Sequence, residues 1–78
     1  MYIGTREYKF KGMIMYHMAA DGIDELHQMA TSLGIDNKYF QDKPGKPHYD
    51  ITKSKKQLAI KLGAKEVNDR QLILLWKN

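Results

Sequence analysis

The residues of this chain that could do chemistry are three histidines and the acids and phenols near them. His48, Tyr49 and Asp50 are consecutive, so a phenol stands between an imidazole and a carboxylate. Side chains alternate between the two faces of a strand, which predicts His48 and Asp50 on one face and Tyr49 with Ile51 on the other. An imidazole beside a carboxylate suits acid–base chemistry, metal binding and anion binding.

The other two histidines lie in the elements that must position them. His17 ends an apolar run, which predicts a central strand over residues 13–20. His27 lies in a predicted helix, roughly 80° from the middle of its apolar stripe and therefore at the boundary between core and solvent. Taken alone, a histidine such as His17 is more often a buried, hydrogen-bonded core residue. A compact fold could nevertheless bring all three rings together, and the residues alone leave that question open.

The remaining elements follow from hydrophobic spacing and from helix start and stop signals. In chain order we expect an N-terminal arm or edge strand within 1–11, the strand over 13–20, a helix over 23–33, a surface loop over 34–47 with Tyr39 and Phe40 tucked onto the core, a short strand over 48–51, a helix over 53–62, a small strand over 64–67 and a last helix after Asn68. These elements predict a small α+β fold, a single domain over 1–78 with a short sheet packed against two or three helices.

Polar residues are expected at the helix starts. Thr52 is a predicted N-cap, Asn68 with Gln71 three residues later is typical of a reciprocal cap, and Glu25 is placed to reach back to the start of the first helix. The last helix, which contains Leu72 and Trp76, is expected to close the core.

Three lysines crowd the first turn of the helix after Thr52. Lys53, Lys55 and Lys56 stand at the positive end of the helix dipole, which is unfavourable for cations. A solvated lysine face is the commoner explanation of such a run. An anion bound at the helix start would also remove the conflict, so these lysines are candidate ligand-binding residues.

Composition limits the class of protein. The chain has 78 residues, no cysteine, and thirteen Lys and Arg against nine Asp and Glu, for a net charge of +4. This balance is compatible with an anionic partner and equally with solubility alone. No segment approaches the ~20 apolar residues of a membrane span, and the N-terminus has no signal-peptide core. We expect no membrane partner and a cytoplasmic location.

The chain resembles a family of short bacterial and phage proteins known as domain of unknown function 4031. The resemblance covers residues 13–75 and rests on His17 with Asp21, Glu25-Leu26-His27, His48-Tyr49-Asp50, Gly63-Ala64, Val67 and Arg70. Bacterial members look similar but have a tryptophan where Tyr16 stands and a shorter loop before the His-Tyr-Asp segment, while Lys9-Phe10-Lys11 looks like a phage-encoded form. The resemblance implies a site without naming a function, and it favours a shared polar pocket.

Three classes of function remain open, and non-catalytic binding of a phosphorylated ligand, a nucleotide or nucleic acid, is favoured. The ligand-binding candidates are His17, His27, His48, Tyr49, Asp50, Lys53, Lys55, Lys56 and Arg70. If nucleic acid is the partner, binding should weaken steeply as salt rises.

The first alternative is a metal- or His-dependent hydrolase acting on phosphodiesters. Its candidate catalytic groups are His17, His27, His48 and Asp50, and the candidate metal ligands are the same residues with Asp21. A divalent metal is compatible with these residues but not required by them, since HExxH and cysteine-based motifs are absent from the sequence.

The second alternative is a protein-interaction module or an inhibitor of a host protein. Its adhesive surface would be formed by Met13, Met15, Met18, Tyr2 and Tyr8. The polar motif would then only stabilise the fold. A free N-terminal edge strand would also be compatible with a homodimer formed by strand pairing.

Overall fold

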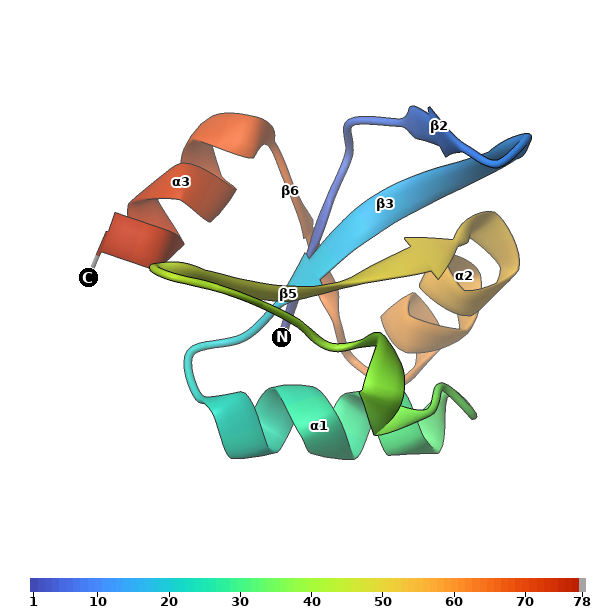
Figure 1. The fold of residues 1–78 in the computed structure, drawn as a ribbon, viewed down its shortest axis with the longest axis horizontal. Helices are drawn as coiled ribbons and strands as arrows, with labels where there is room; N and C mark the ends of the chain where they lie inside the picture. Colours follow the sequence, from blue (N-terminus) through green and yellow to red (C-terminus); the bar gives the residue numbers. More distant parts are fainter. Residues whose placement is uncertain (78) are drawn as a thin grey trace.

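A mixed sheet separates two layers of helices in the computed structural model, which describes residues 1–77 (Figure 1). The elements are β1 (Tyr2–Gly4), β2 (Tyr8–Phe10), β3 (Met13–Ala19), α1 (Ile23–Ser32), the 3-10 helix η1 (Asn37–Tyr39), β4 (Gln41–Lys43), β5 (Lys46–Thr52), α2 (Lys53–Lys61), β6 (Lys65–Val67) and α3 (Asp69–Lys77). The strand order is β4-β5-β3-β1-β6, and β2 pairs with β3 beyond the end of β1. The chain is therefore a small α+β domain, as predicted.

The strand β3 lies at the middle of the sheet because its apolar residues can be covered on both faces. Tyr16 and Met18 point toward α1 and α2, where they pack with Tyr49 and Ile51 of β5 in the main core. The intervening residue His17 points to the opposite face, which α3 covers. The alternation predicted for residues 48–51 is confirmed, and it divides the polar residues of β5 from its core residues.

The predicted N-terminal edge strand is divided into two strands. β1 lies between β3 and β6, antiparallel to the first and parallel to the second, so it is an interior strand. β2 pairs with β3 alone among the pairings of the described residues. The sequence pattern missed the pairing with β6 because a three-residue strand carries too little periodicity to show that both of its edges are occupied.

Two of the three expected helix starts have the predicted caps. Thr52 accepts a hydrogen bond from the Lys55 amide, and Asn68 and Gln71 bond each other's backbone amides at 2.9 Å each. The prediction for Glu25 was wrong. No side chain caps α1, and the Glu25 carboxylate instead accepts from the N-terminal ammonium group at 3.2 Å. A positive charge brought in by β1 is a stronger partner for a carboxylate than a backbone amide.

The segment 34–47 was predicted as a surface loop, but the structure forms η1 and a β4–β5 hairpin there. Gly45, with a φ of 75°, supplies the left-handed turn residue of the hairpin. β4 was missed because Gln41-Asp42-Lys43 shows no apolar alternation. Phe40 does pack against the core, whereas Tyr39 is 58% exposed, so the prediction for this pair holds for Phe40 only.

The adhesive surface considered in the second alternative lacks two of its three methionines. Met15 and Met18 are buried, and Met13 alone of these three is exposed, because β3 is covered on both faces over most of its length. Phe10, Met13 and Ile14 remain exposed around the β2–β3 turn. No helix of the described residues is long and apolar enough to cross a membrane.

Candidate functional site

A cluster of two imidazoles and one carboxylate lies on the sheet face beneath α3. His17 and Asp50 are directly opposed residues of β3 and β5, and His17 Nδ1 lies 3.0 Å from Asp50 Oδ1. His48, two residues earlier on the same face of β5, places its Nε2 3.3 Å from the same oxygen. The two rings meet edge to face with their centroids 4.7 Å apart. Strand register thus brings together two residues, His17 and Asp50, that are 33 positions apart in the chain.

Asp50 is held as a carboxylate by its donors. Burial alone would raise the pKa of Asp50, but the contacts with His17, His48 and Tyr8 outweigh that effect and hold the pKa far below its usual range. The pKa of the Tyr8 phenol is raised by burial and by its hydrogen bond to Asp50. Tyr8 therefore remains a protonated donor, and Asp50 remains an acceptor, at neutral pH.

His48 is fixed in orientation by a second hydrogen bond. Its Nδ1 donates to the Lys46 carbonyl oxygen at 2.8 Å, and the ring is buried. A carbonyl oxygen can only accept, so Nδ1 carries the proton and Nε2 faces Asp50. His17, His48 and Asp50 each offer one possible metal-ligating atom, and these atoms all lie within 4.8 Å of one another.

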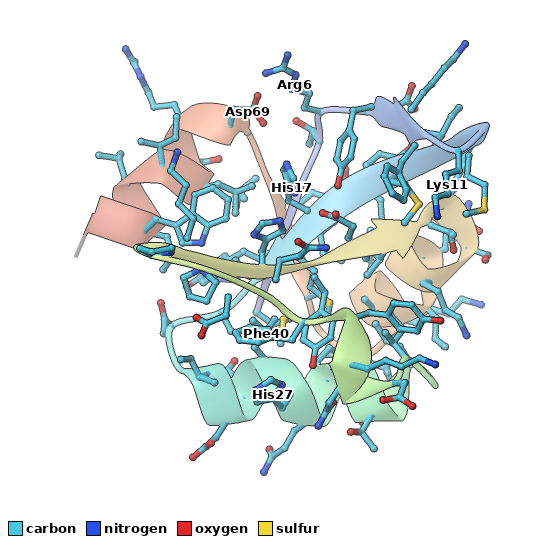
Figure 2. All side chains as sticks on the ribbon, viewed as in Figure 1. Arg6, Lys11, His17, His27, Phe40 and Asp69 are labelled. Carbon is cyan, nitrogen blue, oxygen red and sulfur yellow. The ribbon has the colours of Figure 1, made fainter. Side chains whose placement is uncertain are left out.

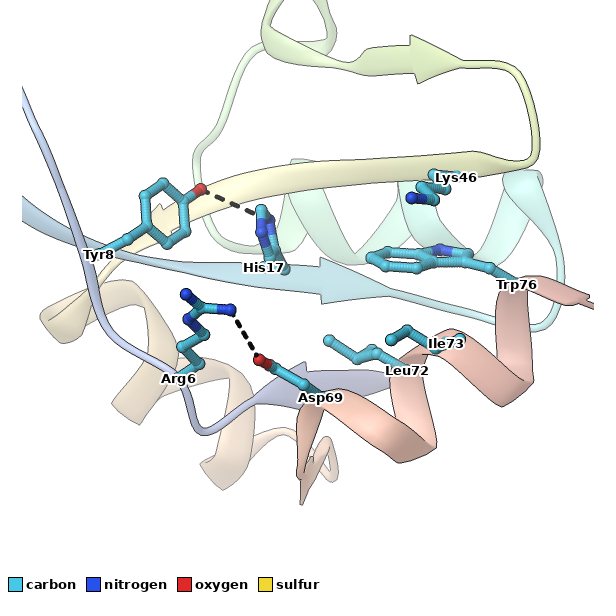
Figure 3. A pocket seen from close by; sticks show the side chains of 8 residues that line it. All are labelled: Arg6, Tyr8, His17, Lys46, Asp69, Leu72, Ile73 and Trp76. Atoms are coloured by element: carbon cyan, nitrogen blue, oxygen red, sulfur yellow. Dashed lines mark hydrogen bonds and ion pairs between the residues drawn. The ribbon is translucent and has the colours of Figure 1, made fainter.

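A cavity of about 360 Å³ opens beside this cluster, between the sheet and α3 (Figure 3). Trp76 of α3 forms one wall, with its ring centroid 6.2 Å from that of His17, and its Nε1 donates to the Pro47 carbonyl oxygen at 3.3 Å. The cavity is lined by Arg6, Tyr8, His17, Lys46, Asp69, Leu72, Ile73 and Trp76. Aromatic and apolar surface thus lies next to charged groups of both signs.

The two cations of the cavity, Arg6 and Lys46, come from different parts of the chain. Arg6 precedes β2 and makes a 3.3 Å ion pair with Asp69 at the start of α3, visible as a dashed line in Figure 3. Both side chains are well exposed, so the pair is weak. Lys46 reaches the cavity from the start of β5. Arg6 can therefore exchange Asp69 for another anion at little cost.

The third histidine lies on the other face of the sheet. His27 Nδ1 donates to the Tyr49 hydroxyl at 2.7 Å, and that hydroxyl donates to Asn37 Oδ1 at 3.1 Å. Figure 2 shows His27 on α1 with Phe40 close to it, across the β5 strand from His17. Because Tyr49 and its neighbours His48 and Asp50 point to opposite faces, a ring bonded to Tyr49 cannot join the other two. Two of the three imidazoles meet, not three as expected.

The three lysines predicted as ligand-binding residues also lie outside the cavity lining. Lys55 Nζ donates to the Leu33 carbonyl oxygen at 2.6 Å and so caps the end of α1, while Lys56 pairs with Glu66 at 3.2 Å and lies over the Tyr16 ring. Lys53 is exposed. For two of the three lysines, the crowding of cations at the start of α2 is thus offset by partners within the protein.

Two further candidates have other surroundings. Asp21 accepts from the Tyr2 hydroxyl at 3.5 Å and is not part of the metal-ligating group. Arg70 is exposed and does not line the cavity, although its neighbour Asp69 does. The sequence reasoning missed Arg6, Tyr8, Lys46, Asp69 and Trp76. A single tryptophan near the end of an amphipathic helix was the only signal that could have suggested one of them.

Comparison with known protein families identifies one match that spans the whole chain. A family described as a protein of unknown function, DUF4031, matches residues 1–78. The chain belongs to this family. No curated protein and no solved structure matches it.

Proposed function

We propose that the protein binds a small phosphorylated ligand of mononucleotide size in the cavity between the sheet and α3. The observation that carries this proposal is the lining itself. Arg6, from the connection between β1 and β2, and Lys46, from the start of β5, line the cavity together with the rings of Tyr8, His17 and Trp76. Cations beside aromatic rings suit a phosphate joined to a base. Neither the three lysines of α2 nor Arg70 is needed for this site.

The polar groups are suited to a phosphate. The planar guanidinium of Arg6 can donate two parallel hydrogen bonds to phosphate oxygens, and the Lys46 ammonium adds a second positive charge. The Arg6 side chain is 75% exposed, and within the described part of the chain its one ionic partner is Asp69. A phosphate has more negative charge and more acceptor oxygens than this carboxylate, so we expect it to compete for Arg6.

The size of the cavity favours a single nucleotide over a nucleic acid strand. Its volume of about 360 Å³ lies near the lower end of the ~300–1,000 Å³ of small-molecule pockets. Leu72 and Ile73 give the cavity an apolar side. A base or another flat group that packed against this side would bury its own apolar surface away from water. Trp76 supplies a face or edge for contact with that group.

Phosphodiester hydrolysis is the second candidate function. The observation that favours it is the His17–Asp50 pair, in which a carboxylate orients an imidazole that lines the cavity. Such a ring can move a proton to or from a bound ligand. This activity would use the same cavity and would require the same binding step.

The proposal is tested by titrating the protein with adenosine monophosphate and, separately, with adenosine while backbone amide NMR signals are recorded. We expect the nucleotide to bind at least about tenfold more tightly, because only it can contact Arg6 and Lys46. The shifted signals should belong to residues around the cavity. Equal binding of both compounds, or no binding of either, would contradict the proposal. Phosphorus NMR with a dinucleotide shows whether the ester is also cleaved.

Removing the competing carboxylate should strengthen binding. In Asp69→Asn, Arg6 no longer has an ionic partner, and a surface ion pair contributes about 0.2–1 kcal/mol. We expect adenosine monophosphate to bind about twofold to fivefold more tightly by isothermal titration calorimetry. Asp24→Asn is the matched control, since it makes the same charge change at an exposed position of α1. An equal gain in both variants would mean that net charge, not Arg6, is responsible.

A further inference from the structure

The cluster beneath the cavity has a geometry that hydrogen bonds alone do not explain well. We propose that His17, His48 and Asp50 bind one divalent cation of the zinc class through Nδ1, Nε2 and Oδ1 respectively. This metal site goes beyond the proposed nucleotide binding and can be tested without any nucleotide. His27 and Asp21, considered from the sequence as metal ligands, are not part of it.

The first argument concerns the proton on His48. Its Nδ1–H is committed to the Lys46 carbonyl oxygen at 2.8 Å, so the neutral ring presents a lone pair at Nε2. That lone pair faces Asp50 Oδ1, which carries negative charge, at 3.3 Å. Two lone pairs so placed repel each other unless a positive species lies between them. A second proton or a metal ion would meet this requirement.

The second argument is the length of the contact. A charge-assisted hydrogen bond between an imidazolium and a carboxylate is typically ~2.7–2.9 Å long, clearly shorter than the 3.3 Å observed. Two ligand atoms bound to one tetrahedral zinc ion at ~2.0–2.1 Å are ~3.3–3.4 Å apart. The His17 Nδ1 to Asp50 Oδ1 distance of 3.0 Å is close to the same range. All three ligand atoms lie within 4.8 Å of one another, so binding one ion would draw the His17 and His48 nitrogens closer together.

The third argument is the support around the ligands. Metal-binding histidines usually donate their other ring nitrogen to a carbonyl or carboxylate oxygen, which fixes the ring and its tautomer. His48 does so to Lys46, and its ring is buried, so it is already oriented without a metal. The backbone pairing of His17 with Asp50 fixes the other two ligands across neighbouring strands. Ligands on paired strands need little rearrangement to bind an ion.

The ligand types select the class of ion. Two imidazole nitrogens and one carboxylate oxygen suit zinc and similar transition metals, whereas magnesium and calcium prefer shells made of oxygen alone. Three protein ligands leave a fourth position open, as in zinc sites that bind an external ligand. His17 lines the cavity, so this position would open toward it. A ligand oxygen, from water or from a phosphate, is the chemistry expected there.

The test is calorimetric titration of zinc into untagged, chelator-treated protein, with magnesium as the comparison ion. We expect one zinc ion per chain, bound at least about 100-fold more tightly than magnesium. Asp50→Asn should weaken zinc binding by about 100-fold, because a carboxamide is a poor ligand. His27→Gln, the matched control, removes the histidine on the other face and should change the affinity by less than about threefold. Absence of saturable binding of one zinc per chain by the wild type would overturn the proposal, as would an equal loss in both variants.

A second measurement does not depend on any variant folding correctly. Ring signals of the histidines are followed by NMR in the wild-type protein during the zinc titration. The signals of His17 and His48 should change together and reach completion at one equivalent, while those of His27 stay unchanged. Changes confined to His27, or spread over all three rings, would show binding elsewhere and overturn the site. Unchanged His17 and His48 signals would also overturn the site.

Discussion

Leu72→Ala is expected to lower the free energy of unfolding by about 2–5 kcal/mol, the usual cost of removing a fully buried leucine side chain. Leu72 is 1% exposed and, among the α3 side chains that the structure describes, it alone is buried. It lies over Gly4 of β1, where an added methyl group would come within 2.8 Å of Leu72 Cδ1. The absent side chain at Gly4 thus makes room for the contact that holds α3.

The control for this prediction is Leu74→Ala, the same change two residues later in the same helix. Leu74 is 56% exposed, so its loss should alter the free energy of unfolding by less than about 0.5 kcal/mol. Urea unfolding, followed by Trp76 fluorescence and by circular dichroism, measures both variants. Trp76 is the single tryptophan and lies on α3. Equal costs for the two leucines would show that α3 is not anchored through Leu72.

The same experiment can show whether α3 is released before the rest of the fold. If the helix loses its main anchor, the fluorescence transition of Leu72→Ala should occur at lower urea than the circular dichroism transition. Because α3 supplies Asp69, Ile73 and Trp76 to the cavity, this variant should also bind adenosine monophosphate weakly. Stability and binding would then be linked through one buried contact.

The fold was predictable from the sequence where the signal is local. Three such signals act within a few residues of the structure they determine. They are the apolar run of β3, the caps Thr52 and Asn68, and the glycines Gly34 and Gly63, which follow α1 and α2. The failures lie where the cause is distant. The interior place of β1 depends on β6, at the other end of the chain, and the partner of Glu25 is the N-terminus brought in by β1.

The candidate site was likewise predictable where the signal is local and not where it is distant. The shared face of His48 and Asp50 follows from strand alternation, and the register of β3 with β5 adds His17. His27 was included only because it lies at the edge of an amphipathic stripe, and that position is equally consistent with the opposite face of the sheet. Arg6 and Tyr8 could not be found, because nothing in residues 1–11 indicates that β2 pairs with β3 and brings Tyr8 against His17.

The α2 lysines show how a local electrostatic argument can point to the wrong partner. The crowding of Lys53, Lys55 and Lys56 at a helix start is unfavourable, and an anion was one way to relieve it. The structure instead provides the carbonyl oxygen of Leu33 and the carboxylate of Glu66 for two of the three. These acceptors are supplied by α1 and β6, so they are invisible in the sequence near the lysines.

Replacing both cavity cations should nearly abolish nucleotide binding. We expect each of Arg6→Gln and Lys46→Gln to weaken the binding of adenosine monophosphate by about tenfold, through loss of a charge-assisted hydrogen bond to phosphate. The two side chains come from different elements, and no hydrogen bond or ion pair joins them in the described part of the chain. Their effects should therefore add, to give about a 100-fold loss in the double variant.

A charge-matched control separates contact with the phosphate from long-range attraction. Lys9→Gln with Lys65→Gln lowers the net charge from +4 to +2, as the cavity double variant does, but at exposed positions outside the cavity lining. Long-range attraction is screened by salt beyond about 10 Å at 0.1 M, so at that ionic strength this control should lose less than about threefold in affinity. Calorimetry of both double variants at low and high salt compares the two effects. Equal losses would mean that the phosphate responds to net charge and has no specific place beside Arg6 and Lys46.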